Sequence, residues 1–258
     1  MIRKRALLAA LFGFVLLAGC SVGIAAPDRT APASVPAAPG QDLTADGFMN
    51  ALVAAQAAVK TYTMDMAMET EMVGKATKVT SKGSVDQTDK TRISMLMDTD
   101  VGGMKMTLLK VDGELYVKMP LTGEKWLKVP RSQMAQYEGT AGSTDLAAGL
   151  EKARSAMKKV TLVGDEAIDG GNTRHYRITM DSAGLSQVTG SGATILGDTF
   201  DYDIWLDEAG LIRKVAMDVK AEVEGKAVPM KMDGMIGDYD APVTIIAPAR
   251  EDVADLPG

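Results

Sequence analysis

The feature that most constrains the fold is a strict alternation of apolar and polar residues that begins after Lys60. Successive side chains of an extended strand point to opposite sides, so residues two apart share a face. One side of this segment is apolar and the other is polar, which predicts a long strand with one buried face. The apolar side carries Tyr62, Met64, Met66, Met68, Thr70 and Met72.

The same alternation recurs along most of the chain, in segments separated by turn signals such as Gly102-Gly103 and Asp112-Gly113. Two helical segments are also predicted, one after Thr44 that precedes the alternation and one over 144–157 that interrupts it, each with apolar residues three and four apart. These sequential hairpins predict a single α+β domain over 42–258, built on a large antiparallel sheet. The predicted strands cover 62–72, 76–85, 92–98, 104–108, 115–119, 126–130, 160–167, 174–180, 200–206, 211–223 and 228–232.

Three further segments are predicted to lack long regular elements. The Gly- and Ser-rich stretch 181–198 is typical of a loop or a short helix. Residues 242–248 are bounded by prolines and should form an extended tail. The last ten residues are polar, and we expect them to be loose.

The N-terminus has the composition of a targeting segment. In residues 1–19, Arg3, Lys4 and Arg5 precede an apolar run of about a dozen residues, which is short for a membrane span of about 20. The run ends in Leu17-Ala18-Gly19-Cys20, a string that resembles the bacterial lipobox. The resemblance implies cleavage by signal peptidase II after Gly19 and a diacylglyceryl-modified Cys20.

Residues 20–41 then form the lipidated Cys and a Pro- and Ala-rich tether that has little to bury. Two acyl chains, such as palmitate, on Cys20 would hold the protein stably, because one chain alone binds a membrane only marginally. We therefore expect a protein anchored to the extracytoplasmic face of the cell membrane. This anchor accounts for the single Cys of the chain, which needs no redox role.

The composition also excludes several classes of protein. One Cys and one His argue against disulfide frameworks, multi-His or Cys-rich metal centres and His-based catalysis. A net charge of −6 argues against nucleic acid as a partner. The sequence has neither a nucleophile elbow nor a phosphate-cradling loop, so we predict a protein that is not an enzyme and has no cofactor.

Methionine is unusually frequent, with 18 residues against 4 Phe and 2 Trp. Met-x-Met pairs coat one face of several strands, and three interpretations remain open. The face is a solid core filled by Met, a cavity whose flexible thioethers re-pack around acyl chains, or a Cu(I) site of soft ligands. The residues predicted to line the cavity are Met64, Met66, Met68, Met95, Met97, Met104, Met106, Ile204, Val215, Met217, Met230 and Met232.

His175 is predicted to lie on the other side of its strand. It alternates with Tyr176, Ile178 and Met180, which form the apolar side. We therefore expect a solvated surface His rather than a catalytic or metal-binding one.

Four strings follow one another along the chain: VDGELYV at 111–117, KWLKV at 125–129, YDIWLD at 202–207 with Gly210 and Leu211, and Ala247-Pro248. In this order they are similar to strings of the LppX/LprG group of actinobacterial lipoproteins, which share a LolA-like fold. The resemblance implies a curved half-barrel sheet whose concave face is covered by a few helices and holds lipid or glycolipid chains.

The same resemblance implies that the protein carries lipids from the plasma membrane toward the outer envelope. A receiving partner in the envelope is implied but not identified. The alternative of another class is a structural or interaction lipoprotein with a filled core, and a Met-based Cu(I)-binding protein is a further alternative.

Overall fold

Strands make up most of the described structure. The computed structural model describes residues 42–72, 75–120, 123, 125–131, 154–183, 194–223 and 225–255. Its long helix is α2 (Ala45–Ala57), and a short 3-10 helix, η2 (Arg250–Asp252), lies near the C-terminus. The strands are β1 (Asp42–Leu43), β2 (Thr61–Met72), β3 (Lys75–Asp86), β4 (Ser94–Val101), β5 (Met104–Val111), β6 (Glu114–Lys118), β7 (Trp126–Lys128), β8 (Met157–Ile168), β9 (Gly171–Asp181), β10 (Thr194–Ile195), β11 (Thr199–Asp207), β12 (Ile212–Val223), β13 (Lys226–Gly237) and β14 (Val253–Asp255).

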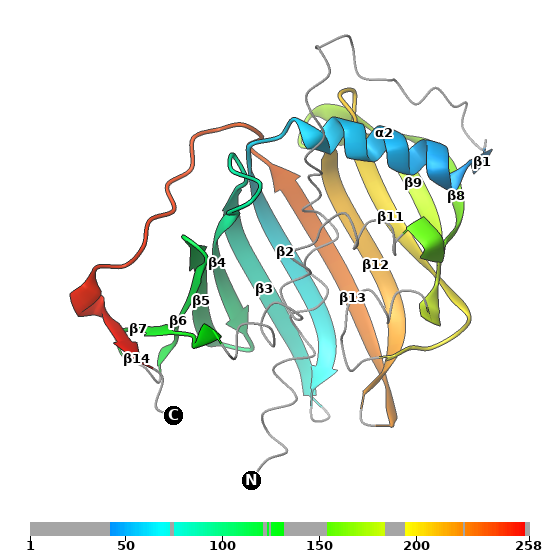
Figure 1. The fold of residues 1–258 in the computed structure, drawn as a ribbon. Helices are drawn as coiled ribbons and strands as arrows, with labels where there is room; N and C mark the ends of the chain where they lie inside the picture. Colours follow the sequence, from blue (N-terminus) through cyan, green and yellow to red (C-terminus); the bar gives the residue numbers. More distant parts are fainter. Residues whose placement is uncertain are drawn as a thin grey trace.

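All of these strands belong to one open sheet (Figure 1). Their order across it is β1-β8-β9-β11-β12-β13-β2-β3-β4-β5-β6-β7-β14, and β10 pairs with β12. Every pairing is antiparallel except that of β14 with β7. The predicted α+β class with a large antiparallel sheet is confirmed.

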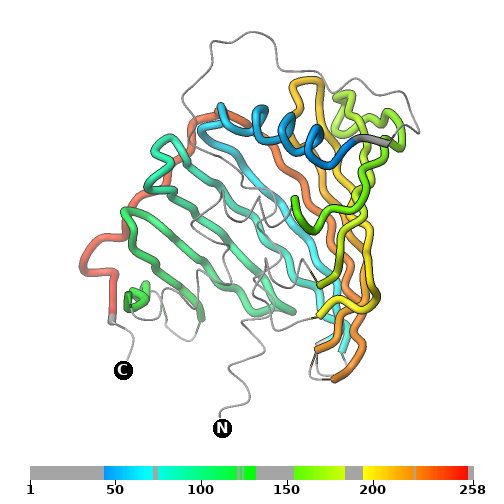
Figure 2. The backbone as a smooth tube through the Cα atoms, turned by 45° about the vertical axis from the view of Figure 1, so that its right-hand side comes forward, coloured from blue at the N-terminus to red at the C-terminus, as the bar shows by residue number. Residues whose placement is uncertain are grey.

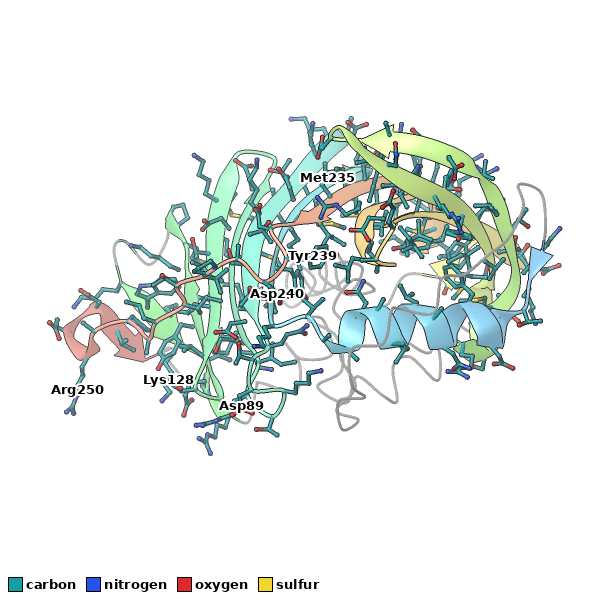
Figure 3. All side chains as sticks on the ribbon, turned by 90° about the horizontal axis from the view of Figure 1, so that it is seen from above. Asp89, Lys128, Met235, Tyr239, Asp240 and Arg250 are labelled. Atoms are coloured by element: carbon teal, nitrogen blue, oxygen red, sulfur yellow. The ribbon has the colours of Figure 1, made fainter. Side chains whose placement is uncertain are left out.

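The sheet is curved, and α2 lies on its concave side. Seen from above, the sheet bends from β7 round to β8, and α2 crosses the concave side of the half that contains β8 to β13 (Figure 3). The tube view shows the same curvature, with the chain after β13 running along one rim toward β14 (Figure 2). None of the described helices is long and apolar enough to cross a membrane.

Local sequence signals account for the main elements. In β2 the alternation predicted from the sequence is observed, with Tyr62, Met64 and Met66 buried. Asp112 and Gly113 have φ angles of 53° and 73°, which suit the two-residue hairpin between β5 and β6. Thr44 caps α2 by accepting a hydrogen bond from the Gly47 amide at 3.1 Å.

Two predictions about secondary structure are wrong. Met157 begins β8 and pairs with Met180, although its spacing suggested the end of a helix. Residues 250–255, which belong to the segment predicted to be loose, form η2 and β14, and Val253 pairs with Trp126. In both cases backbone pairing with a neighbouring strand decides the outcome, and hydrophobic periodicity carries no signal for it. Most of the predicted helix over 144–157 lies outside the described residues.

Candidate functional site

Strand register collects methionines that are distant in the sequence onto one face of the sheet. Met68 of β2 pairs with Met232 of β13, which pairs with Met217 of β12. One position along, Met66 faces Gly234 across the β2–β13 boundary. Side chains paired across strands share a face, so these rows form one continuous surface.

We call this surface the methionine face. It is the concave one, because it continues through β11 and β9 to Tyr176, whose ring packs on Phe48 of α2 with centroids 5.2 Å apart. It consists of Met64, Met66, Met68, Met95, Met97, Met217, Met230, Met232, Ile204 and Val215, all buried in one hydrophobic cluster.

Two of the residues predicted for this surface differ from the rest. Met106 is only partly buried and packs against the edge of the cluster. Met104, the first residue of β5, is 42% exposed and stands outside the cluster. Because it directly follows the turn at Gly102-Gly103, Met104 lies at the rim of the sheet, and we leave it out of the methionine face.

A glycine makes room for the methionine at the centre of the face. A Cβ atom on Gly234 would lie 2.1 Å from Met66 Sδ and 3.0 Å from Val215 Cγ2. Met66 therefore occupies the space above β13 that a larger residue at 234 would fill. The sequence shows this glycine inside a strand, which signals a close approach, but not the residue that approaches.

The face also contains a polar pair that sequence reasoning did not identify. Ser81 of β3 and Thr99 of β4 hydrogen-bond to each other at 3.0 Å, and both are buried. Ser81 pairs with Met66 across the strands. Because the two hydroxyls satisfy each other, the surface they present to the methionines is less polar than their sequence suggests. The sequence contained one signal for this pair, because Ser81 and Thr99 both stand on the apolar side of the alternating pattern of their strands.

The convex face holds a cluster that corrects the expectation for His175. Its side chain is 14% exposed, with Nε2 2.8 Å from Asp203 Oδ1 and the ring stacked on Trp205 at 4.2 Å. Trp205 Nε1 donates to Glu166 Oε2 at 2.6 Å, and Arg177 Nε donates to Asp203 at 2.9 Å. His175 faces away from the apolar side, as predicted, but it is packed between neighbours rather than solvated.

The predicted lipidation site lies outside the described residues. Cys20, the signal segment 1–19 and the tether up to residue 41 are therefore predictions from the sequence. The described domain begins at β1, where Leu43 pairs with Val160 of β8.

Comparisons with known proteins agree with this architecture. The model of the LppX_LprAFG lipoprotein family matches residues 46–245. The structure of LprF from Mycobacterium bovis is 16% identical, with a TM-score of 0.53 over 80% of this chain and 93% of that one. The structure of lipoprotein LppX from Mycobacterium tuberculosis is 12% identical, with a TM-score of 0.52 over 78% of this chain and 98% of that one. The search of curated proteins found no match.

At these identities the two structures show a shared fold. Together with the family match, they confirm the resemblance and the fold class that the sequence predicted.

Proposed function

The chain belongs to the LppX_LprAFG lipoprotein family, and on that premise we propose that it binds the acyl chains of a lipid or glycolipid against the methionine face. In this proposal the protein is anchored on the extracytoplasmic side of the cell membrane and carries its ligand across the envelope. In this proposal the protein is a binding protein and not an enzyme. The protein acts by giving the hydrocarbon chains of the lipid an apolar environment away from water.

The observation that carries the proposal is the composition and continuity of the methionine face. Its methionines come from β2, β4, β12 and β13, and their side chains are between 3% and 8% exposed. An acyl chain gains about 0.8 kcal/mol per buried CH₂ group, so a chain of sixteen carbons gains on the order of 12 kcal/mol before ordering costs. Unbranched thioether side chains adapt to several chain shapes at low cost.

Anchoring follows from the N-terminal segment in this proposal. Two acyl chains on Cys20 hold the protein at the membrane. The tether that follows, in a polyproline-like form of about 3.1 Å per residue, reaches roughly 60 Å. That reach lets the domain of residues 42–258 load at the membrane and deliver at a distance from it.

The test is recovery of lipid by the full chain and by a Met66→Asp variant. We expect native mass spectrometry of the wild-type protein from its own host to show co-purified lipid. A carboxylate at the centre of the methionine face should abolish this recovery, because charge is costly in a dry hydrocarbon site. The matched control is Met104→Asp, since Met104 is exposed and the lipid should still be recovered.

Other outcomes separate the alternatives. If the wild-type protein carries no lipid and Met66→Asp unfolds it, the face is a filled core and the protein is a structural lipoprotein. If the empty protein instead gains mass with Cu(I), the methionines are metal ligands.

A further inference from the structure

Gln56 is a polar residue in the buried apolar stripe of α2. It follows Phe48 and Leu52 at intervals of four residues, so the three side chains share the face that meets the sheet. Gln56 is 3% exposed, and within the described ranges its Nε2 has no hydrogen-bond partner. A buried amide without a partner destabilises a fold, so its presence calls for an explanation.

The end of α2 that carries Gln56 is held firmly in place. The Val59 amide donates to the Gln56 carbonyl at 3.2 Å, and the Lys60 amide donates to Asp240 Oδ1 at 2.8 Å. Thr61 Oγ1 donates to the Ala241 carbonyl at 2.6 Å. The last two bonds tie the helix end to the segment after β13, so the backbone that carries Gln56 is held in place.

Tyr239 shows that the free donor at this position is the amide. Its hydroxyl donates to the Ile212 carbonyl, and its ring centroid lies 6.4 Å from that of Tyr62. Burial raises the pKa of Tyr239 well above its usual range, and the Gln56 side chain, which is close enough to the phenol to interact with it, acts in the opposite direction. The phenol therefore stays protonated, with its proton donated to the Ile212 carbonyl. The Gln56 amide has two N–H groups, and its interaction with Tyr239 uses at most one of them, so at least one remains to donate.

The methionine face begins beside this position. Tyr62 shares one side of β2 with Met64, Met66 and Met68, and all four are buried. At about 3.3 Å per residue, the row from Tyr62 to Met68 is roughly 20 Å long. If an acyl chain lies along this row with its head-group end at Tyr62, the carbonyl group that joins the chain to the head group lies near the end of α2.

We propose that the side-chain amide of Gln56 donates a hydrogen bond to a carbonyl oxygen of the bound lipid, at the point where the acyl chain joins its head group. This inference rests on the proposed function and assigns a ligand class to it, since carbonyl oxygens of acyl esters and amides are strong acceptors. An alkyl ether, which lacks the carbonyl, leaves the buried donor unpaired and binds less tightly.

Gln87 provides a matched control within the same region. It is also 3% exposed, but its Nε2 donates to the Val59 carbonyl at 2.9 Å. Gln87 therefore has a structural role, whereas Gln56 keeps at least one N–H without a partner. Replacing each by Leu removes a buried amide of the same kind with opposite expected effects on stability.

The experiment is a competition between two probes in one mixture. The full chain, purified in a non-ionic detergent, is offered equal amounts of 1-palmitoylglycerol and 1-O-hexadecylglycerol, and native mass spectrometry gives the ratio bound. Detergent competes equally with both probes, so the ratio reports the carbonyl alone. We expect the wild-type protein to favour the ester about tenfold, and Gln56→Leu to reduce the ratio to about one.

Thermal unfolding of the same ligand-free proteins separates a recognition role from a structural one. Gln56→Leu should melt at the wild-type temperature or above it, and Gln87→Leu should melt lower. Gln56→Met serves as a second variant of similar length.

The proposal is overturned if the wild-type protein binds ester and ether equally, or if Gln56→Leu keeps the preference. It is also overturned if both Gln56 variants fail to fold, since Gln56 is then structural. Each of these results leaves lipid binding intact, whereas binding of neither probe by the wild-type protein overturns the proposed function itself.

Discussion

The concave side of the sheet has two regions built from different side chains. Under α2, the region around β8 and β9 is packed with aromatic and branched residues, among them Phe48, Tyr176, Leu162 and Val160, which are all nearly inaccessible to solvent. In the second region, which spans β2, β4, β12 and β13, most of the buried side chains of the methionine face are methionines. Among the residues that the structure describes, none of the largest fully buried side chains is a methionine.

Because of this difference, one part of the sheet is rigid and another part is adaptable. Aromatic and branched side chains have few rotamers and lock neighbouring elements together. Methionine has three rotatable bonds and tolerates changes in the shape of its surroundings. We infer that the first region fixes α2 in place and that the second is free to adapt to a ligand.

The largest expected effect comes from breaking the rigid region. Phe48→Ala removes a side chain that is 1% exposed and packs on Tyr176, so we expect a loss of about 3–5 kcal/mol in the free energy of unfolding. Urea denaturation measures it. Asn50→Ala, on the exposed side of the same helix, should cost less than about 1 kcal/mol. Equal losses for the two variants would show that the contact with Tyr176 does not anchor α2.

Two glycines in the methionine region allow its adaptability to be tested, with a smaller expected loss of stability. A Cβ on Gly83 would lie 2.6 Å from the backbone oxygen of Leu96, whereas a Cβ on Gly234 mainly meets the end of the Met66 side chain. We expect Gly83→Ala to cost about 1–3 kcal/mol and Gly234→Ala less than about 1 kcal/mol, because Met66 can move.

Urea denaturation of both variants checks the order. A larger loss for Gly234→Ala would mean that Met66 is held rigidly, and the contrast between the two regions would fail. Combining Gly234→Ala with Met66→Ala measures how far the two positions are coupled.

The smallest expected effect concerns a group of charged residues on the convex side of β6 and β7. Glu114 pairs with Arg131 at 3.1 Å and with Lys128 at 3.3 Å. The hydrogen bond from Arg131 lowers the pKa of Glu114 below its ordinary value of 4.5. Such a carboxylate stabilises the fold above pH 4.5, and its contribution is lost as the pH falls through the lower folded-state pKa.

We therefore expect Glu114→Gln to cost less than about 1 kcal/mol at neutral pH, since solvent screens such pairs. The difference from the wild-type protein should vanish in acid. Unfolding free energies measured across this pH range check it, and a difference that grows in acid would contradict the assignment.

The strands show how much of the structure can be predicted from short stretches of sequence. Alternation at Met64, Met66 and Met68 predicted both the strand and its buried face, because orientation along a strand depends only on local geometry. The strings that resemble a known lipoprotein family predicted the family and the fold, and both are confirmed. The lining of a lipid site by the methionines stays a prediction.

Contacts between distant segments were beyond local reasoning. Gly234 was visible in the sequence, but its role depends on Met66, more than 160 residues earlier and brought opposite it by the pairing of β13 with β2. The packing of His175 against Trp205 and Asp203 likewise requires the β9–β11 register. The role of Gln56 could not be predicted from the sequence either, because only the packing around the end of α2 shows that its Nε2 lacks a hydrogen-bond partner.

By itself the sequence determined which residues face the same way within each strand and where most strands turn, because backbone stereochemistry and turn preferences act over a few residues. Only the tertiary structure decided which strands lie side by side, which methionine overlies which glycine, and which buried amide is left with a free N–H. Those outcomes depend on register between segments far apart in the chain, and strand register is set by the packing of the whole sheet.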